Sequence, residues 1–120
     1  MHLGRRMKLS GIAEQLGLMP LWTPIDDRDV SFAYASDVLS DVLVRAPKGA
    51  VLTTLQTHLN VVAVAVQAGL AGVIFTNNKR PVDGVIERAE HEKLPLYATA
   101  YDTFEVAGRL FAMGIRGRKL

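Results

Sequence analysis

The sequence of 120 residues contains no cysteine, which excludes disulfide bonds, thiolate nucleophiles and thiolate-ligated metal sites. It also lacks long apolar runs: glycine, asparagine, glutamine or a charged residue interrupts each stretch before it reaches the roughly 18 residues that a membrane span requires. Residues 1–8 are basic, but no apolar segment follows them, so they do not form a secretory signal. We therefore expect a cytoplasmic protein with no membrane partner.

Motifs for phosphate transfer and nucleophilic catalysis are absent as well. No glycine precedes a lysine, which excludes the phosphate-binding loop of nucleotide hydrolases, and no serine lies in a G-x-S-x-G motif. The histidines His2, His58 and His91 do not have the spacing of metal ligands, and the pairing of Glu87 with His91 falls on a polar helical face. The residues alone therefore predict no catalytic residue, no metal and no cofactor.

The net charge of +2 comes from the two ends of the chain. Residues 9–115 hold eight basic and twelve acidic residues, a net charge of −4, and no stripe of basic and aromatic residues runs through them. We expect no dedicated nucleic-acid interface.

With 49% apolar and 22% charged residues the composition is that of one globular domain. We divide the chain into a flexible basic N-terminus (1–8), one domain (9–115) and a basic tail (116–120).

Hydrophobic periodicity and turn residues predict alternating helices and strands. Helices are expected over 9–16, between an N-cap at Ser36 and the stop at Pro47, over 82–92 and over 102–113, where Asp102 and Glu105 have the spacing of a capping box. Extended segments are expected over 18–23, 30–35, 50–54, 70–76 and 94–99. This alternation predicts an α/β fold with three layers, in which helices cover both faces of a mostly parallel sheet.

The segment 59–68 is ambiguous, because its valines favour a strand while its apolar residues show no alternation. Its length, a possible cap at Thr57 and the glycine at Gly69 favour a helix, which we predict. Since this helix would be apolar all round, we expect it to be buried on more than one side.

Polar residues follow the predicted strands at their carboxyl ends, where parallel α/β sheets bind ligands. We therefore predict a site for a small ligand that carries a phosphate or a carboxylate, with Lys79 and Arg80 as cationic neighbours. The same side chains would also serve as caps and turn residues, and that alternative stays open. The candidate binding residues are Ser36, Asp37, Gln56, Thr57, His58, Thr76, Asn77, Asn78, Asp102 and Thr103.

His58 can exchange a proton near neutral pH, but the sequence assigns it no partner. A structural hydrogen bond at a helix start is the simpler role for it. The alternative is a small phosphotransfer or hydrolytic enzyme that uses His58 together with Lys79 or Arg80 as an anion clamp.

Several segments resemble one known family, the DRTGG domain, which is similar to the N-terminal domain of HPr kinase/phosphorylase. The resemblance covers about 9–115 and is carried by residues 34–42, 46–50, 56–65, 70–76, 94–96 and 102–104. The residues that name the family differ here: Thr57-His58 stands in place of Asp-Arg, and Thr76-Asn77-Asn78 in place of Thr-Gly-Gly.

The resemblance implies a regulatory or ligand-sensing domain that accompanies catalytic modules and is not itself a catalyst. It also implies a homodimer, a metabolic enzyme as partner, and a link to hydrogenase-associated redox metabolism. Some members are labelled serine kinases, but the missing phosphate loop argues against that activity here. Besides the enzyme, a pure protein-interaction subunit remains an alternative.

Overall fold

A computed structural model of the protein describes residues 6–24 and 26–119. The helices predicted over 9–16, 59–68, 82–92 and 102–113 are all present, with ends that differ by a few residues. In chain order the elements are β1 (Met7–Lys8), α1 (Leu9–Leu16), β2 (Met19–Pro20), β3 (Asp29–Val30), β4 (Phe32–Ala35), α2 (Leu39–Arg45), β5 (Ala50–Thr54), α3 (Asn60–Ala68), β6 (Gly72–Phe75), α4 (Val85–Glu92), β7 (Leu96–Ala98) and α5 (Thr103–Ala112).

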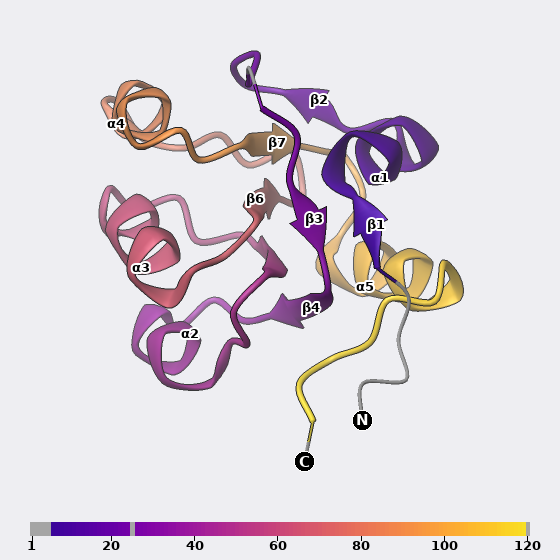
Figure 1. The fold of residues 1–120 in the computed structure, drawn as a ribbon. Helices are drawn as coiled ribbons and strands as arrows, with labels where there is room; N and C mark the ends of the chain where they lie inside the picture. The colour runs from indigo at the N-terminus through magenta and orange to yellow at the C-terminus, as the bar shows by residue number, and fades with distance from the viewer. Residues whose placement is uncertain (1–5, 25, 120) are drawn as a thin grey trace.

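The main sheet has five strands in the order β2-β7-β6-β5-β4 (Figure 1). The strands β4, β5, β6 and β7 are parallel, and β2 pairs antiparallel with β7 at one edge, with Met19 opposite Ala98. Every residue of β5, β6 and β7 is buried, which explains why these strands are nearly continuous apolar runs without polar alternation. The predicted mostly parallel α/β architecture is confirmed.

Helices cover both faces of this sheet (Figure 1). The helices α2, α3 and α4 lie on one face, over a core that includes Leu52 and Phe75. The helices α1 and α5 lie on the other face, over a core that includes Val51, Ile74 and Val106. Residues that follow one another in a strand belong to different cores, because their side chains point to opposite faces.

Gly72 lies where the Leu9 side chain of α1 packs closely on β6. A Cβ atom at this position would lie 2.8 Å from Cδ2 of Leu9 and 3.1 Å from the carbonyl oxygen of Pro95. Only glycine leaves room for this approach, so the residue fixes how tightly α1 packs on β6.

The single strand predicted over 30–35 is wrong, because the structure divides it at Ser31. The strand β3 pairs antiparallel with β1 in a separate ribbon, and β4 joins the main sheet. Since Met7–Lys8 form β1, this part of the predicted flexible segment 1–8 is a paired strand, and residues 1–5 lie outside the described residues. The extended segment predicted over 18–23 is reduced to the strand Met19–Pro20.

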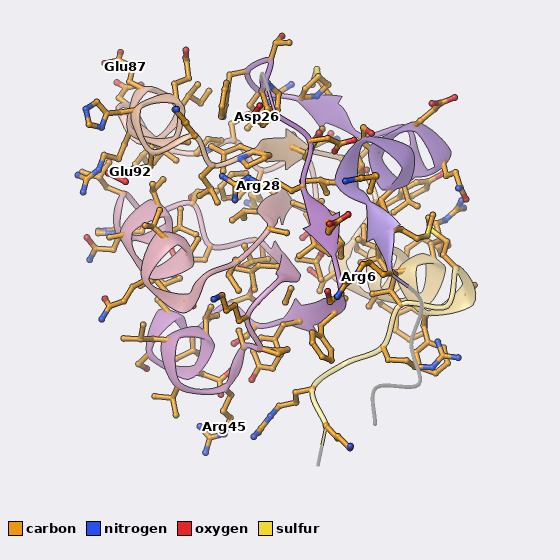
Figure 2. All side chains as sticks on the ribbon, viewed as in Figure 1. Arg6, Asp26, Arg28, Arg45, Glu87 and Glu92 are labelled. Carbon is orange, nitrogen blue, oxygen red and sulfur yellow. The ribbon has the colours of Figure 1, made fainter. Side chains whose placement is uncertain are left out.

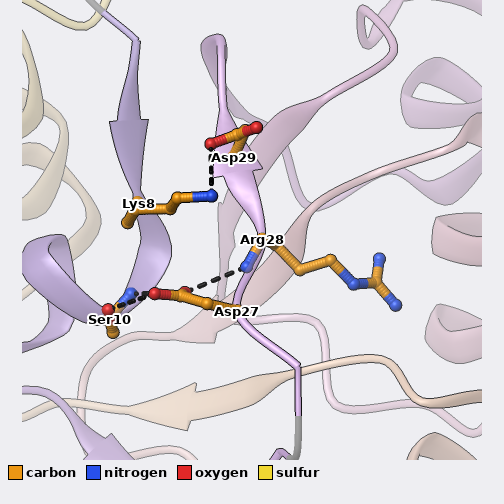
Figure 3. A network of polar contacts seen from close by, with 5 residues as sticks. All are labelled: Lys8, Ser10, Asp27, Arg28 and Asp29. Atoms are coloured by element: carbon orange, nitrogen blue, oxygen red, sulfur yellow. Dashed lines mark hydrogen bonds and ion pairs between the residues drawn. The ribbon is translucent and has the colours of Figure 1, made fainter.

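A polar network holds this ribbon to α1 (Figure 3). The Ser10 hydroxyl and backbone N–H both donate to the Asp27 carboxylate, the Arg28 N–H donates to it at 2.9 Å, and Lys8 forms an ion pair with Asp29 at 3.0 Å. Burial raises the pKa of Asp27, but the hydrogen bonds from Ser10 and Arg28 outweigh it and hold the pKa below the ordinary value.

Two helix starts differ from the prediction. The N-cap of α2 is Val38 instead of Ser36, because the Ser36 hydroxyl accepts a hydrogen bond from the Val38 N–H in a turn that delays the helix. The N-cap of α3 is Leu59 instead of Thr57, and neither N-cap provides a side-chain hydrogen bond. The Asp102 cap of α5 is confirmed, since its carboxylate accepts from the Glu105 N–H at 2.8 Å.

The helix α3 is correctly predicted, and it packs against the sheet core and against both α2 and α4, although it is not buried all round. Val61, Val62 and Ala65 are buried, while Val66 is 44% exposed. The sheet covers one side of α3 and solvent reaches the other, with α2 and α4 beside it (Figure 1).

Charged side chains lie on the outside of the molecule. Figure 2 shows Glu87 on the outer side of α4 and Arg45 pointing away from the end of α2. The side chains of Glu87 and His91 are both exposed, as expected for a solvated helical face. Among residues 6–24 and 26–119, no helix combines the length and apolar character needed to cross a bilayer.

Candidate functional site

The carboxyl ends of β4, β5, β6 and β7 meet at one edge of the sheet, because these strands are parallel and neighbouring. We call this the carboxyl edge. All of the candidate binding residues lie in the segments that follow these strands or in the first turn of α5. The predicted position of these residues at the carboxyl ends of the strands is present in the fold, and their side chains form two separate groups along the carboxyl edge.

The first group joins β4 to β5. The Asp37 carboxylate accepts hydrogen bonds from the Thr54 hydroxyl and from the Leu55 N–H, both at 2.9 Å. The Gln56 side chain donates to the Asp37 carbonyl at 3.3 Å, and the Ser36 N–H donates to the Thr53 carbonyl at 3.4 Å. These contacts explain why polar residues follow both strands: they connect the two strand ends to each other.

Close to this group, Tyr34 of β4 and Asp41 of α2 form a hydrogen bond that connects the strand to the helix. The Tyr34 hydroxyl donates to the Asp41 carboxylate at 2.8 Å. This hydrogen bond lowers the pKa of Asp41, and burial together with the same bond raises the pKa of Tyr34.

His58 belongs to the turn that precedes α3. Its N–H donates to Oε1 of Gln56 at 3.0 Å, and its Nδ1 accepts from the Asn60 N–H at 3.1 Å. The predicted structural hydrogen bond of this histidine is therefore present. Within the described part of the chain its ring contacts no carboxylate, and Thr57 contributes only its carbonyl, which accepts from the Val82 N–H at 3.1 Å.

The second group joins β6 to β7 and α5. The Thr76 and Thr103 hydroxyl oxygens lie 2.7 Å apart. Asn77 and Asn78 both have positive φ, at 59° and 56°, and their N–H groups donate to the carbonyls of Tyr101 and Thr99 at 2.9 Å. Asparagine tolerates this left-handed conformation, which allows the chain to turn sharply after β6.

Asp102 has a structural role in this group. Because its carboxylate caps α5, the positive end of that helix already faces a negative charge. Two cations remain close by. The side chains of Lys79 and Arg80 are exposed and form no hydrogen bond or ion pair with any described residue.

A pocket of about 530 Å³ opens at the β7 end of the carboxyl edge. We call it the β7 pocket. Among the residues that the structure describes, no carboxylate lines it, and Arg80 is its one charged lining residue. Its lining residues are Leu16, Gly17, Met19, Asn78, Arg80, Ala98, Thr99, Ala100 and Tyr101.

Of the candidate binding residues, only Asn78 lines the β7 pocket. Arg80, a cationic neighbour of the predicted site, also lines it. The sequence reasoning missed the pocket because one of its walls comes from the end of α1 and from β2, which precede the parallel strands in the chain. Local sequence patterns do not report that β2 pairs with β7.

Apolar side chains are also exposed along the carboxyl edge. They lie in the segments that follow the four parallel strands, and Phe104 in the first turn of α5 is 85% exposed. We call this set the apolar rim. Its members are Val38, Leu55, Leu59, Val82, Tyr101 and Phe104.

Comparisons with known proteins identify the fold and the family. The chain matches the DRTGG domain over residues 32–113, about two thirds of its length. This confirms the resemblance, over a shorter range than the predicted 9–115. The search of curated proteins found no match.

Among solved structures, the chain is similar to the CBS and DRTGG domains of the regulatory region of Clostridium perfringens pyrophosphatase, crystallised with the activator diadenosine tetraphosphate. The TM-score is 0.64 at 13% sequence identity, and the match covers 90% of this chain and 47% of that one. The chain thus spans about half the length of this structure, and at this identity the similarity establishes the fold.

Proposed function

The chain belongs to the DRTGG domain family, and on this premise we propose that it is a non-catalytic regulatory domain that senses a small phosphate- or carboxylate-bearing ligand at the carboxyl edge. The solved relative supports the proposal, because there a domain of this fold is part of the regulatory region of an enzyme that was crystallised with an activator. A metabolic enzyme is accordingly the partner that we propose. The implied link to hydrogenase-associated redox metabolism and the cytoplasmic location stay predictions.

The observation that carries this proposal is that Lys79 and Arg80 form no ion pair with a described residue. Both cations follow β6 at the carboxyl edge, and neither is neutralised by a described carboxylate. A cation without an ion pair beside a pocket favours anionic ligands, because charge-assisted hydrogen bonds to carboxylate or phosphate are about twice as strong as neutral ones.

A thermal-shift screen tests the proposal. The probes are AMP, ATP, acetyl phosphate, glucose 6-phosphate, inorganic phosphate and acetate, and glucose serves as the neutral counterpart. A ligand present at 100 times its dissociation constant adds about 2.7 kcal/mol to the stability of the folded state. We expect stabilisation by at least one anionic probe, and its loss in the double variant Lys79→Gln/Arg80→Gln. The control Arg88→Gln removes an exposed cation from α4. The absence of stabilisation by every anionic probe at millimolar concentration would overturn the proposal.

We further propose that the domain forms a homodimer through the apolar rim. The apolar rim gathers exposed apolar side chains at one edge of the sheet, which favours an interaction surface, and most oligomers of a single chain are symmetric dimers. If the rim instead binds a different protein, the chain would act as an interaction subunit, which co-purification of a partner without any ligand response would indicate.

The enzymatic alternative is less well supported by the contacts of His58. A general base needs a free lone pair that can accept a proton, and the lone pair on Nδ1 of this ring already accepts a backbone N–H at the start of α3. Phosphate release from acetyl phosphate or ATP that disappears in His58→Ala would favour the enzyme over the regulatory domain.

A further inference from the structure

The β7 pocket combines an apolar body with few polar groups. Leu16 and Met19 come from α1 and β2, while Ala98 and Ala100 come from the end of β7 and the loop after it. A volume of about 530 Å³ lies within the range of pockets that enclose small organic ligands. The apolar lining means that a bare inorganic anion would fill little of the pocket, so its ligand needs an apolar or aromatic part.

Tyr101 provides an aromatic surface that is held in place. The Arg109 guanidinium lies over its ring, 4.3 Å from the centroid, and Arg109 is itself held by Glu105 through a hydrogen bond of 2.8 Å. The guanidinium covers one face of the ring, and the same residue lines the β7 pocket. A fixed aromatic ring favours a flat partner, because offset stacking stabilises pairs of planar rings.

The polar groups of the pocket lie on the loop that follows β6. The Asn78 backbone is fixed by its hydrogen bond to the Thr99 carbonyl, and its side-chain amide has no partner among the described residues. An amide offers both a donor and an acceptor, which suits the edge of a heterocyclic base. Arg80, whose guanidinium is also without a partner among these residues, offers a planar cation for phosphate.

From this arrangement we infer that the β7 pocket binds a mononucleotide-type ligand, with the base beside Tyr101 and Asn78 and the phosphate at Arg80. The inference rests on the proposed function and narrows it to one pocket and one ligand class. It also separates the pocket from the polar group around Asp37, Gln56 and His58, which lies at the other end of the carboxyl edge and whose hydrogen bonds are made within the protein.

The test is a titration of the ¹⁵N-labelled full chain with AMP and GMP, followed by amide chemical shifts. Adenosine supplies the base without the phosphate, and ribose 5-phosphate supplies the phosphate without the base. We expect AMP or GMP to shift the amides of Gly17, Asn78 and residues 98–101, and each half-molecule to bind more weakly than the whole.

Two neighbouring cations provide a matched pair of variants. Arg80 lines the pocket and Lys79 does not, although both are exposed and both are without an ion pair among the described residues. Loss of one charge-assisted hydrogen bond corresponds to about a tenfold change in affinity. We expect Arg80→Gln to weaken nucleotide binding by about this factor and Lys79→Gln to leave it nearly unchanged.

The possible failures are distinct from that of the proposed function. Nucleotide-induced shifts at Asp37, Gln56 and His58 in place of the pocket amides would overturn the inference and keep the ligand-sensing domain. The same conclusion follows if neither nucleotide binds while acetyl phosphate or glucose 6-phosphate stabilises the protein. Equal losses in Arg80→Gln and Lys79→Gln would overturn the pocket assignment, because they would indicate general attraction of anions. If no anionic probe stabilises the chain, both proposals fail.

Discussion

The hydroxyl groups of Thr76 and Thr103 form a hydrogen bond, with 2.7 Å between their oxygens, that connects the end of β6 to the first turn of α5. Thr76 is fully buried and Thr103 is partly buried, and one of the two hydroxyl groups donates to the other. This contact holds α5 against the carboxyl edge next to the loop that contains Asn77 and Asn78.

We expect Thr76→Val to destabilise the protein by about 1–2 kcal/mol, because the substitution leaves the Thr103 hydroxyl without its partner in a partly buried place. The midpoint and slope of urea unfolding measure this change. A variant as stable as the parent would mean that solvent replaces the bond without loss.

Thr53 on β5 provides the opposite test, in which a threonine hydroxyl is buried without a hydrogen-bond partner in the described part of the chain. Its hydroxyl is buried and has no hydrogen-bond partner among the described residues. Because an unsatisfied buried hydroxyl is unfavourable, we expect Thr53→Val to raise the free energy of unfolding by about 1 kcal/mol in the same measurement. Destabilisation would contradict this expectation and would indicate a buried water on the hydroxyl.

Glycine substitutions distinguish close packing from helix propensity. Gly72→Ala places a Cβ against Leu9 and the Pro95 carbonyl, and we expect a loss of about 1–3 kcal/mol. Gly108→Ala in α5 meets no atom within 4 Å, and we expect a gain of about 0.5–1 kcal/mol from improved helix propensity. Thermal unfolding of the two variants should show shifts of opposite sign. Shifts of the same sign would mean that α1 can move away from β6.

The sequence was sufficient to predict the parallel sheet and most helices because their signals are local. Gly17 and Gly69 end α1 and α3 with positive φ of 66° and 70°, and apolar runs between such stops indicate buried strands. Helix N-caps were less predictable, since Ser36 and Thr57 lie in turns whose hydrogen bonds satisfy other groups.

The features that could not be predicted depend on contacts between distant parts of the chain. The ribbon pairs Met7 with Val30, Ser10 binds Asp27 beside it, and a periodic pattern contains no information about either pair. The β7 pocket exists because Met19 pairs with Ala98 across the antiparallel edge of the sheet. The residues on the carboxyl edge could be identified from their positions after strands, but the pocket among them could not.

The Ser10 and Asp27 contact makes part of the stability dependent on pH. The folded pKa of Asp27 lies below its ordinary value of 3.8, so its ionised form stabilises the fold above the pH at which the unfolded carboxyl titrates. This contribution is lost as the pH falls through the folded pKa. We expect Ser10→Ala to be about 1 kcal/mol less stable than the parent at neutral pH, with the difference closing as the pH falls through the folded pKa of Asp27.

Urea unfolding of the parent and of Ser10→Ala at a series of pH values checks this expectation. Ser40→Ala is the control, because Ser40 is exposed on α2 and its hydroxyl forms no hydrogen bond with a described residue. A difference between Ser10→Ala and the parent that is constant from neutral to acidic pH would show that the hydroxyl acts through packing and not through the Asp27 charge.

The proposed dimer can be tested with two phenylalanines of one helix. Phe104 belongs to the apolar rim in the first turn of α5 and is 85% exposed, while Phe111 is 59% exposed near the other end of the helix, under the Arg116 guanidinium.

If the rim is the dimer interface, sedimentation at micromolar concentration gives twice the 13.1 kDa mass of one chain for the parent and for Phe111→Ser. Phe104→Ser should sediment as a monomer, because a polar side chain in an apolar interface removes burial that holds the two copies together. Since Phe104 is almost fully exposed in the single chain, this variant should unfold at the same urea concentration as a parent monomer and so separate loss of association from loss of folding. A parent protein that sediments at 13.1 kDa, or a dimer that Phe104→Ser leaves intact, would exclude the rim as a self-association surface.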